Sequence, residues 1–210
     1  MSITVHTPRK LIQEHLDLFV IAVGLFLIGF TYGLQPEYAQ PIIQHAQEIH
    51  IDPYDTLTNI RAIFVNNMLI SIVTWLGWFM LPLFGLECFP PSVMIYNVGA
   101  AYGAVASYVS LEQFVLTLAT FGVIEAVGLI FGMMAGLIFP KYALMKILGR
   151  NVSFASYAQD SLSFMFYSAI ALLIGALFES LLLNPMTTVL GVISGLVISI
   201  FLLRLIFKEE

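Results

Sequence analysis

Long apolar stretches, separated by short polar segments, dominate the chain from residue 16 to residue 207. A helix needs about 20 mostly apolar residues to cross roughly 30 Å of hydrocarbon. Six stretches approach or meet this length, and the third is the shortest. They span residues 16–34, 63–86, 93–109, 114–139, 162–183 and 186–207. This pattern predicts an all-α fold, a polytopic transmembrane helix bundle of about six spans, in which residues 1–210 form a single transmembrane domain.

The segment between the first two stretches, residues 35–62, has a different pattern. Apolar residues recur there at helical spacing, with polar residues between them. The apolar positions are Ile42, Ile43, Ala46 and Ile49, and the polar ones are Gln44, Gln47 and Glu48. This spacing predicts a short amphipathic helix that lies along the outer membrane surface or packs over the bundle. A second helix is expected to start at Asp52, whose side chain would cap it, and to continue into the second span.

Basic residues are sorted between the two ends of the predicted spans. If the N-terminus is cytoplasmic, the inner segments hold Arg9, Lys10, Lys141, Lys146, Arg150, Arg204 and Lys208, and the outer segments hold Arg61. Cytoplasmic loops of membrane proteins carry an excess of lysine and arginine. We therefore expect both termini in the cytoplasm and a multi-pass protein of the cell membrane. The inner connection 140–160 is either an amphipathic helix against anionic lipid heads or a solvated loop.

Composition excludes several other classes of protein. Hydrophobic residues make up 60% of the chain and charged residues only 10%, whereas soluble domains contain about 25% charged residues. So few charges could not cover a soluble protein of this size. No lysine and arginine cluster forms the basic face that nucleic-acid binding needs. The expected partners are membrane lipid and, as open possibilities, other membrane proteins or further copies of the chain.

The sequence offers no constellation for catalysis. It contains no His-Glu-x-x-His zinc motif, no Gly-x-Ser-x-Gly turn and no phosphate-binding glycine loop. Its single cysteine, Cys88, excludes a cysteine-rich metal site. The four histidines, His6, His15, His45 and His50, lie outside the predicted spans or at their edges. We therefore expect no enzyme activity, no cofactor and no metal.

Glycines recur at four-residue spacing in several of the apolar stretches. Glycine lets helix backbones approach closely within a membrane. The positions are Gly29, Gly33, Gly99, Gly103, Gly128, Gly132, Gly136, Gly191 and Gly195, and Gly122 and Gly175 are expected to act in the same way. Most of these glycines are predicted to pack helices within one chain, and a minority could form a contact between two copies.

Two carboxylic acids and three asparagines interrupt the apolar stretches. Glu125 lies almost at the centre of the fourth, on the helix face of Gly122 and Gly128, so it should point toward a neighbouring helix. An ionisable group at that depth must be paired, hydrated or protonated. The other candidates are Glu179 near the outer end of the fifth stretch, Asn66 and Asn67 near the outer end of the second, and Asn97 within the third. They form either a binding site for a proton, an ion or a small solute, or hydrogen bonds that only join helices.

Three motifs follow one another along the chain. They are Ile-Phe-Val-Asn-Asn at 63–67, Phe-Gly-Val-Ile-Glu at 121–125, and Leu-Ile-Gly-Ala-Leu-Phe-Glu at 173–179, which Pro185 follows. With these motifs, residues 60–207 resemble the stage II sporulation protein M-like (SpoIIM-like) integral membrane proteins. The resemblance implies that Asn66, Asn67, Glu125, Glu179 and Pro185 are characteristic positions of the family. The family often has Pro-His where this chain has Thr120 and Phe121, so no role of that histidine is carried over.

Two functions are consistent with these observations. The first is a transporter-like or channel-like protein in which Glu125 is the ionisable site, with Glu179, Asn66 and Asn67 near an outer vestibule. The second is a non-transporting scaffold that docks other proteins through the segment 35–62. The resemblance supports the second, because the namesake of the family looks like a partner in a membrane complex that remodels the cell wall during spore engulfment. A hydrated cavity that reaches Glu125 would favour transport, and a dry core would favour a scaffold.

Overall fold

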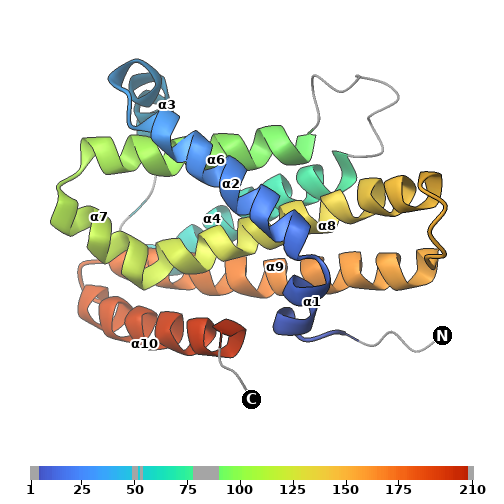
Figure 1. The fold of residues 1–210 in the computed structure, drawn as a ribbon. Helices are drawn as coiled ribbons and strands as arrows, with labels where there is room; N and C mark the ends of the chain where they lie inside the picture. Colours follow the sequence, from blue (N-terminus) through green and yellow to red (C-terminus); the bar gives the residue numbers. More distant parts are fainter. Residues whose placement is uncertain (1–4, 49–51, 53, 78–89, 208–210) are drawn as a thin grey trace.

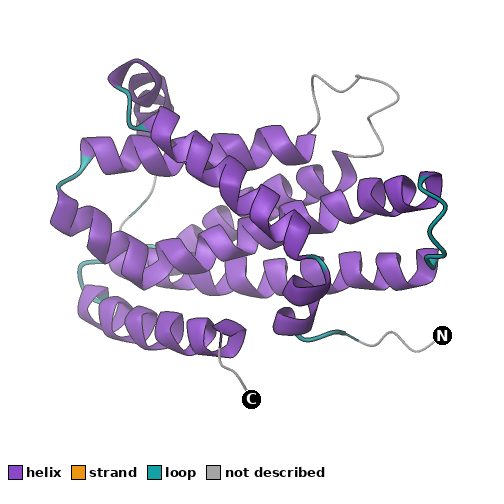
Figure 2. Ribbon diagram, viewed as in Figure 1, coloured by secondary structure: helices purple, strands orange, loops and turns teal. Residues whose placement is uncertain are grey.

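The computed structural model describes residues 5–48, 52, 54–77 and 90–207, and every regular element within these ranges is a helix (Figures 1 and 2). The elements are α1 Pro8–Glu14, α2 Leu16–Gly33, α3 Pro36–Glu48, α4 Thr56–Leu76, α6 Pro90–Tyr108, α7 Leu111–Thr117, η3 Leu118–Gly122, α8 Val123–Ile147, α9 Phe154–Leu183 and α10 Thr188–Phe207. The all-α prediction is confirmed for these ranges. Residues 49–51, 53 and 78–89, which belong to the predicted outer segment and second span, lie outside the described part of the chain.

Within the described ranges, four helical segments are long and apolar enough to cross a membrane. They are α2, α4, the continuous segment Leu111–Ile147 formed by α7, η3 and α8, and α9. A shorter apolar stretch, Thr188–Phe201, lies in α10. Large apolar side chains lie exposed on the outer faces of the helices, for example Leu27 on α2, Leu69 on α4 and Ile193 on α10. Extensive exposed apolar surface is typical of a protein that binds a membrane or a partner.

Successive long helices run in opposite directions through the bundle (Figure 1). The helix α2 crosses α6 obliquely, α8 and α9 form an antiparallel hairpin, and α10 returns beside α9. At one end of the bundle α3 packs against α6, in the segment predicted to hold an amphipathic helix. The short helix α1 packs against α9 and α10. Its position brings the start of the chain to the side of the bundle, away from α3 (Figure 1).

The hairpin of α8 and α9 is longer than the sequence predicts. The helix α8 extends to Ile147 and α9 begins at Phe154, so the loop between them is only residues 148–153. Gly149 ends α8 with a φ of 73°, a conformation that glycine adopts without the steric cost that other residues incur. Of the two alternatives for residues 140–160, a separate interfacial helix or a solvated loop, the loop holds only for residues 148–153, and the rest of the connection belongs to α8 and α9.

The helix α4 runs on into the second span as predicted but begins a few residues later than expected, at Thr56, and a different residue caps it. The Asp55 carboxylate accepts a hydrogen bond of 3.0 Å from the Thr58 backbone N–H, whereas Asp52 accepts one from the Tyr54 backbone N–H. The prediction that Asp52 caps this helix was wrong. The hydrogen bond from Thr58 lowers the pKa of the Asp55 carboxyl group, and the resulting negative charge complements the positive end of the helix dipole.

Glycines bring the backbones of α2 and α6 into direct contact. A Cβ atom at Gly29 would overlap the carbonyl group of Tyr96, and one at Gly103 would overlap the carbonyl group of Phe30. The other two glycines of this interface, Gly33 and Gly99, face the carbonyl groups of Ala100 and Phe26 in the same way. Because each obstacle is backbone, no side-chain movement could make room for a larger residue.

We expect Gly103→Ala to destabilise the protein by about 1–3 kcal/mol, because the added methyl group pushes two backbones apart. Gly24→Ala is the matched control on α2, since a Cβ at Gly24 would have no heavy atom within 4 Å. Thermal unfolding in detergent should show a lower melting temperature for Gly103→Ala than for the parent protein. The melting temperature of the Gly24→Ala control should not fall. Equal melting temperatures would contradict the close contact between α2 and α6.

Candidate functional site

The Glu125 carboxylate is held between three helices. From its position on α8, its Oε1 accepts a hydrogen bond from the Asn67 side-chain amide of α4. Its Oε2 lies 3.1 Å from the Tyr102 hydroxyl of α6. The same hydroxyl lies 2.9 Å from the carbonyl oxygen of Gly122. A tyrosine hydroxyl has one proton to donate, so the carboxylate and the carbonyl compete for it.

This competition gives the site two satisfied hydrogen-bond states. When Glu125 is ionised, Tyr102 donates its proton to the carboxylate. When Glu125 is protonated, its own hydroxyl can donate to the Tyr102 oxygen, which then donates to the Gly122 carbonyl. A proton can therefore enter or leave Glu125 while the three side chains keep their positions.

A π-helical segment of five residues, η3, ends three residues before Glu125 and directly precedes α8. Its carbonyl groups bond to two other helices, since the Gly122 carbonyl accepts from Tyr102 on α6 and the Thr120 carbonyl accepts from Ser199 on α10 at 3.2 Å. Short π-helical turns within α-helices are rare and occur often at functional sites. The backbone irregularity therefore links Glu125 to both α6 and α10.

Glu179 is the second carboxylate near this position. It lies one turn beyond Gly175 on α9, and a Cβ at Gly175 would lie 3.4 Å from the Glu125 Cβ. Within the ranges that the structure describes, no residue donates a hydrogen bond to Glu179, and no lysine or arginine pairs with either carboxylate. The two acids thus lie on neighbouring helices that pack together at Gly175, without a counter-charge from these ranges.

The structure does not bring Asn66 and Asn97 to this site. Both are exposed, on α4 and α6, whereas Asn67 is buried. An α-helix has 3.6 residues per turn, so adjacent residues such as Asn66 and Asn67 point in directions about 100° apart. Only one member of the pair can therefore face Glu125.

One small void lies in the interior beyond Glu125, on the side of later residues of α8. This void lies between α4, α6 and α8 and has no room for a water molecule. Its lining is mostly apolar and consists of Ile70, Ser71, Thr74, Met94, Ile95, Val98, Leu129 and Met133. A dry apolar space of this kind excludes water and ions.

The remaining predicted packing glycines lie in three places. Gly128 and Gly132 on α8 face Leu172 of α9 and Ser71 of α4, and Gly136 is buried in the same helix. On α10, Gly191 faces Leu181 of α9, and Gly195 faces the Thr120 carbonyl of η3. Gly122 is buried in η3 with Tyr102 as a neighbour. Glycines therefore let α10, as well as α8, pack closely against the helices around Glu125.

The sequence interpretation missed Tyr102 and the π-helical segment. A signal for Tyr102 existed, because tyrosine in membrane helices concentrates at the interfaces and this one lies between Gly99 and Gly103 within a predicted span. The π-helical turn had no comparable signal, since Leu118–Gly122 reads as ordinary apolar helix.

These helices define an all-α protein with membrane-spanning character. The sequence profile of the family Stage II sporulation protein M matches residues 18–182. The chain belongs to this family, which confirms the resemblance drawn from its three motifs. The match covers Asn67, Tyr102, Glu125 and Glu179 and ends before α10. No curated protein and no solved structure matches the chain.

Proposed function

We propose that this protein is a membrane carrier that binds a proton or a small cation at Glu125 and Glu179. The observation that supports the proposal is the packing of Gly175, one turn before Glu179, against Glu125, together with the lack of a basic residue in the described ranges that pairs with either carboxylate. Two like charges in a medium of low dielectric constant disfavour each other's ionised form. A shared proton or a bound cation removes this repulsion, and either can dissociate again. No catalytic step is part of the proposal.

The proposed carrier crosses the cell membrane six times and keeps both ends in the cytoplasm. Successive long helices alternate in direction (Figure 1), and all basic residues except Arg61 then fall on the cytoplasmic side. In this orientation α3 and the end of α9 lie outside, and the loop between α8 and α9 lies inside. Glu179 is then close to the outer end of α9 and Glu125 lies deeper.

Cysteine labelling tests this orientation. In a variant that lacks Cys88, a single cysteine at Ser110 should react with a membrane-impermeant maleimide added to intact cells. A single cysteine at Arg150 should react only after the membrane is opened, because its loop would face the cytoplasm. Labelling of the Arg150 position in intact cells would overturn the proposed topology.

Contacts on both sides of the carboxylates favour a carrier over an open channel. Inward of Glu125, the void between α4, α6 and α8 is too small for water. Outward of Glu179, the Ser180 hydroxyl donates to the Thr56 carbonyl at 2.8 Å, and the Asn184 amide donates to the Thr56 hydroxyl at 2.9 Å. These bonds join α9 to the start of α4. A cation would therefore reach the site only after helices separate, as in alternating access.

Flux into liposomes tests the transport function. Purified protein should carry protons or alkali cations down an imposed gradient, and Glu125→Gln should abolish this flux. Glutamine keeps the shape of the side chain and its hydrogen-bonding capacity but cannot exchange a proton or balance a cation. Glu179→Gln should reduce the flux strongly for the same reason.

The matched control is Glu112→Gln, which neutralises an exposed acid at the start of α7. Its flux should equal that of the unmodified protein. All three variants must show the same helical content and elution volume as the parent. Flux that is unchanged in Glu125→Gln, or no flux above that of empty liposomes, would contradict the carrier function.

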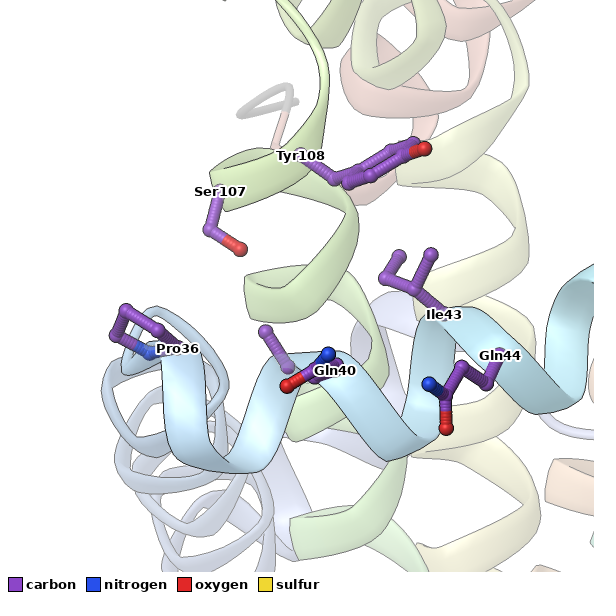
Figure 3. Close-up of a pocket in the computed structure, with 7 residues that line it drawn as sticks. Pro36, Gln40, Ile43, Gln44, Ser107 and Tyr108 are labelled. Carbon is purple, nitrogen blue, oxygen red and sulfur yellow. The ribbon is translucent and has the colours of Figure 1, made fainter.

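A second candidate function, the docking of a partner protein, is supported by a cavity at the bundle end. The cavity has a volume of about 400 Å³ and lies between α3 and the end of α6. Its lining residues are Pro36, Ala39, Gln40, Ile43, Gln44, Ser107 and Tyr108. Figure 3 shows Ile43 pointing toward Tyr108, with the amides of Gln40 and Gln44 on the same helix. This mixture of apolar wall and amide groups suits a peptide segment.

Co-purification from native membranes tests the docking function. A partner that inserts into this cavity should be lost in the double variant Gln40→Ala/Gln44→Ala. It should be retained in Asn97→Ala, which changes an exposed amide elsewhere on α6. Equal recovery from both variants would exclude the cavity as the docking site.

A further inference from the structure

A second cluster of ionisable side chains lies at the junction of α1, α2, α8 and α9, apart from Glu125. The Asp160 carboxylate is its centre, with Oδ1 2.8 Å from His6 Nδ1 and Oδ2 3.1 Å from His15 Nε2. The other ring nitrogen of His15 lies 3.2 Å from Lys141 Nζ, which also lies 2.5 Å from the Asp17 carboxylate. Asp160 and His15 are only 4% and 3% exposed, so these contacts are shielded from bulk water.

This chain of contacts fixes the proton positions around Asp160. A lysine ammonium group can only donate hydrogen bonds, so His15 Nδ1 must accept one from Lys141. The proton of a neutral His15 ring is then on Nε2, and it is donated to Asp160 Oδ2. One oxygen of Asp160 is thereby held in place, and the other faces the His6 ring.

Glu14 completes a set of three potential metal ligands. One ligand atom from each of His6, Glu14 and Asp160 lies within 4.8 Å of the other two. Glu14 is half exposed and has an ion pair of 3.8 Å with Lys10 on the same helix, an exposed type of pair that contributes little to stability. A cation between the Glu14 and Asp160 carboxylates would reduce their mutual repulsion, and a neutral His6 ring offers a nitrogen as a further ligand.

We propose that His6, Glu14 and Asp160 bind one Zn²⁺ ion, with water as the fourth ligand. Zn²⁺ binds imidazole nitrogen and carboxylate oxygen at about 2.0–2.2 Å in tetrahedral geometry, which places neighbouring ligand atoms about 3.3 Å apart. His6 Nδ1 lies 2.8 Å from Asp160 Oδ1, and the three ligand atoms all lie within 4.8 Å of one another, so side-chain movements can bring them to this spacing. His15 supports Asp160 from behind, as outer hydrogen-bond partners support ligands in metal sites.

The site differs from the sequence expectation of no metal and goes beyond the proposed carrier function. Of its ligands, His6 lies just before α1 and Glu14 is the last residue of α1. The third ligand, Asp160, is on α9. The ion would therefore attach α1 to the hairpin of α8 and α9. Its ligands are separate from Glu125 and Glu179, so binding can be tested without any transport assay.

Calorimetric titration of the purified full-length protein with Zn²⁺, after removal of any affinity tag, tests the proposal. One Zn²⁺ should bind per chain. His6→Asn and Glu14→Gln should each weaken binding at least tenfold, because an amide replaces a strong ligand while hydrogen bonding to Asp160 or Lys10 remains possible. Glu112→Gln, an exposed acid far from this cluster, should bind as the parent does.

Co²⁺ in place of Zn²⁺ provides an independent readout. A tetrahedral site gives the bound Co²⁺ an intense visible absorption that an octahedral aqueous ion lacks. This absorption should appear with the parent protein and disappear with His6→Asn. No saturable Zn²⁺ binding, or an affinity and Co²⁺ spectrum unchanged by His6→Asn and Glu14→Gln, would overturn the site, and both variants should keep the parent's helical content.

Discussion

A carboxylic acid inside a bundle of apolar helices has to find its hydrogen-bond partners within the protein, because lipid offers none. In this protein Glu125 of α8 meets Asn67 of α4 and Tyr102 of α6. These bonds determine which faces of three helices meet. Gly175 then lets α9 approach the same residue, and η3 connects it to α10. The central arrangement of helices depends on satisfying this one group.

Buried carboxylic acids occur at two levels in the described part of the bundle, and the core between them is mostly apolar with a few buried hydroxyl groups. One level contains Glu125, and the other contains Asp160 near the loop between α8 and α9. The core between them includes the buried side chains of Phe131, Met133, Met134 and Phe164. The hydrogen-bond partners of Glu125 and those of Asp160 are different residues, so the two groups are not joined through a shared side chain.

Local signals in the sequence predicted much of the architecture. Apolar length predicted the long helices, and an acid on a glycine face predicted that Glu125 points toward its neighbours, because both depend on residues close together in the chain. The hydrogen-bond partners of Glu125 were harder to predict from the sequence. Asn67 was identified but could not be separated from Asn66, because helix rotation decides which of them faces α8. Tyr102 was missed because its role depends on how α6 packs against η3.

The cluster around Asp160 could not be predicted from the sequence, because its members come from distant parts of the chain. His6 and Asp160 are 154 positions apart in the chain, and no short motif joins them. Each histidine appeared as an ordinary residue at the edge of a span. Only the folding of α1 back onto α9 places these groups together, and periodicity along the sequence does not contain that information. The same holds for the short loop after Gly149, where two helices continue beyond their most apolar residues.

Infrared difference spectroscopy of the protein in liposomes, between acidic and alkaline buffer, tests most directly whether Glu125 exchanges a proton while held by its neighbours. The account predicts a protonated-carboxyl C=O band that Glu125→Gln removes and that Tyr102→Phe shifts, because the tyrosine hydroxyl bonds to that group. A spectrum that is identical in the parent protein and both variants would contradict it.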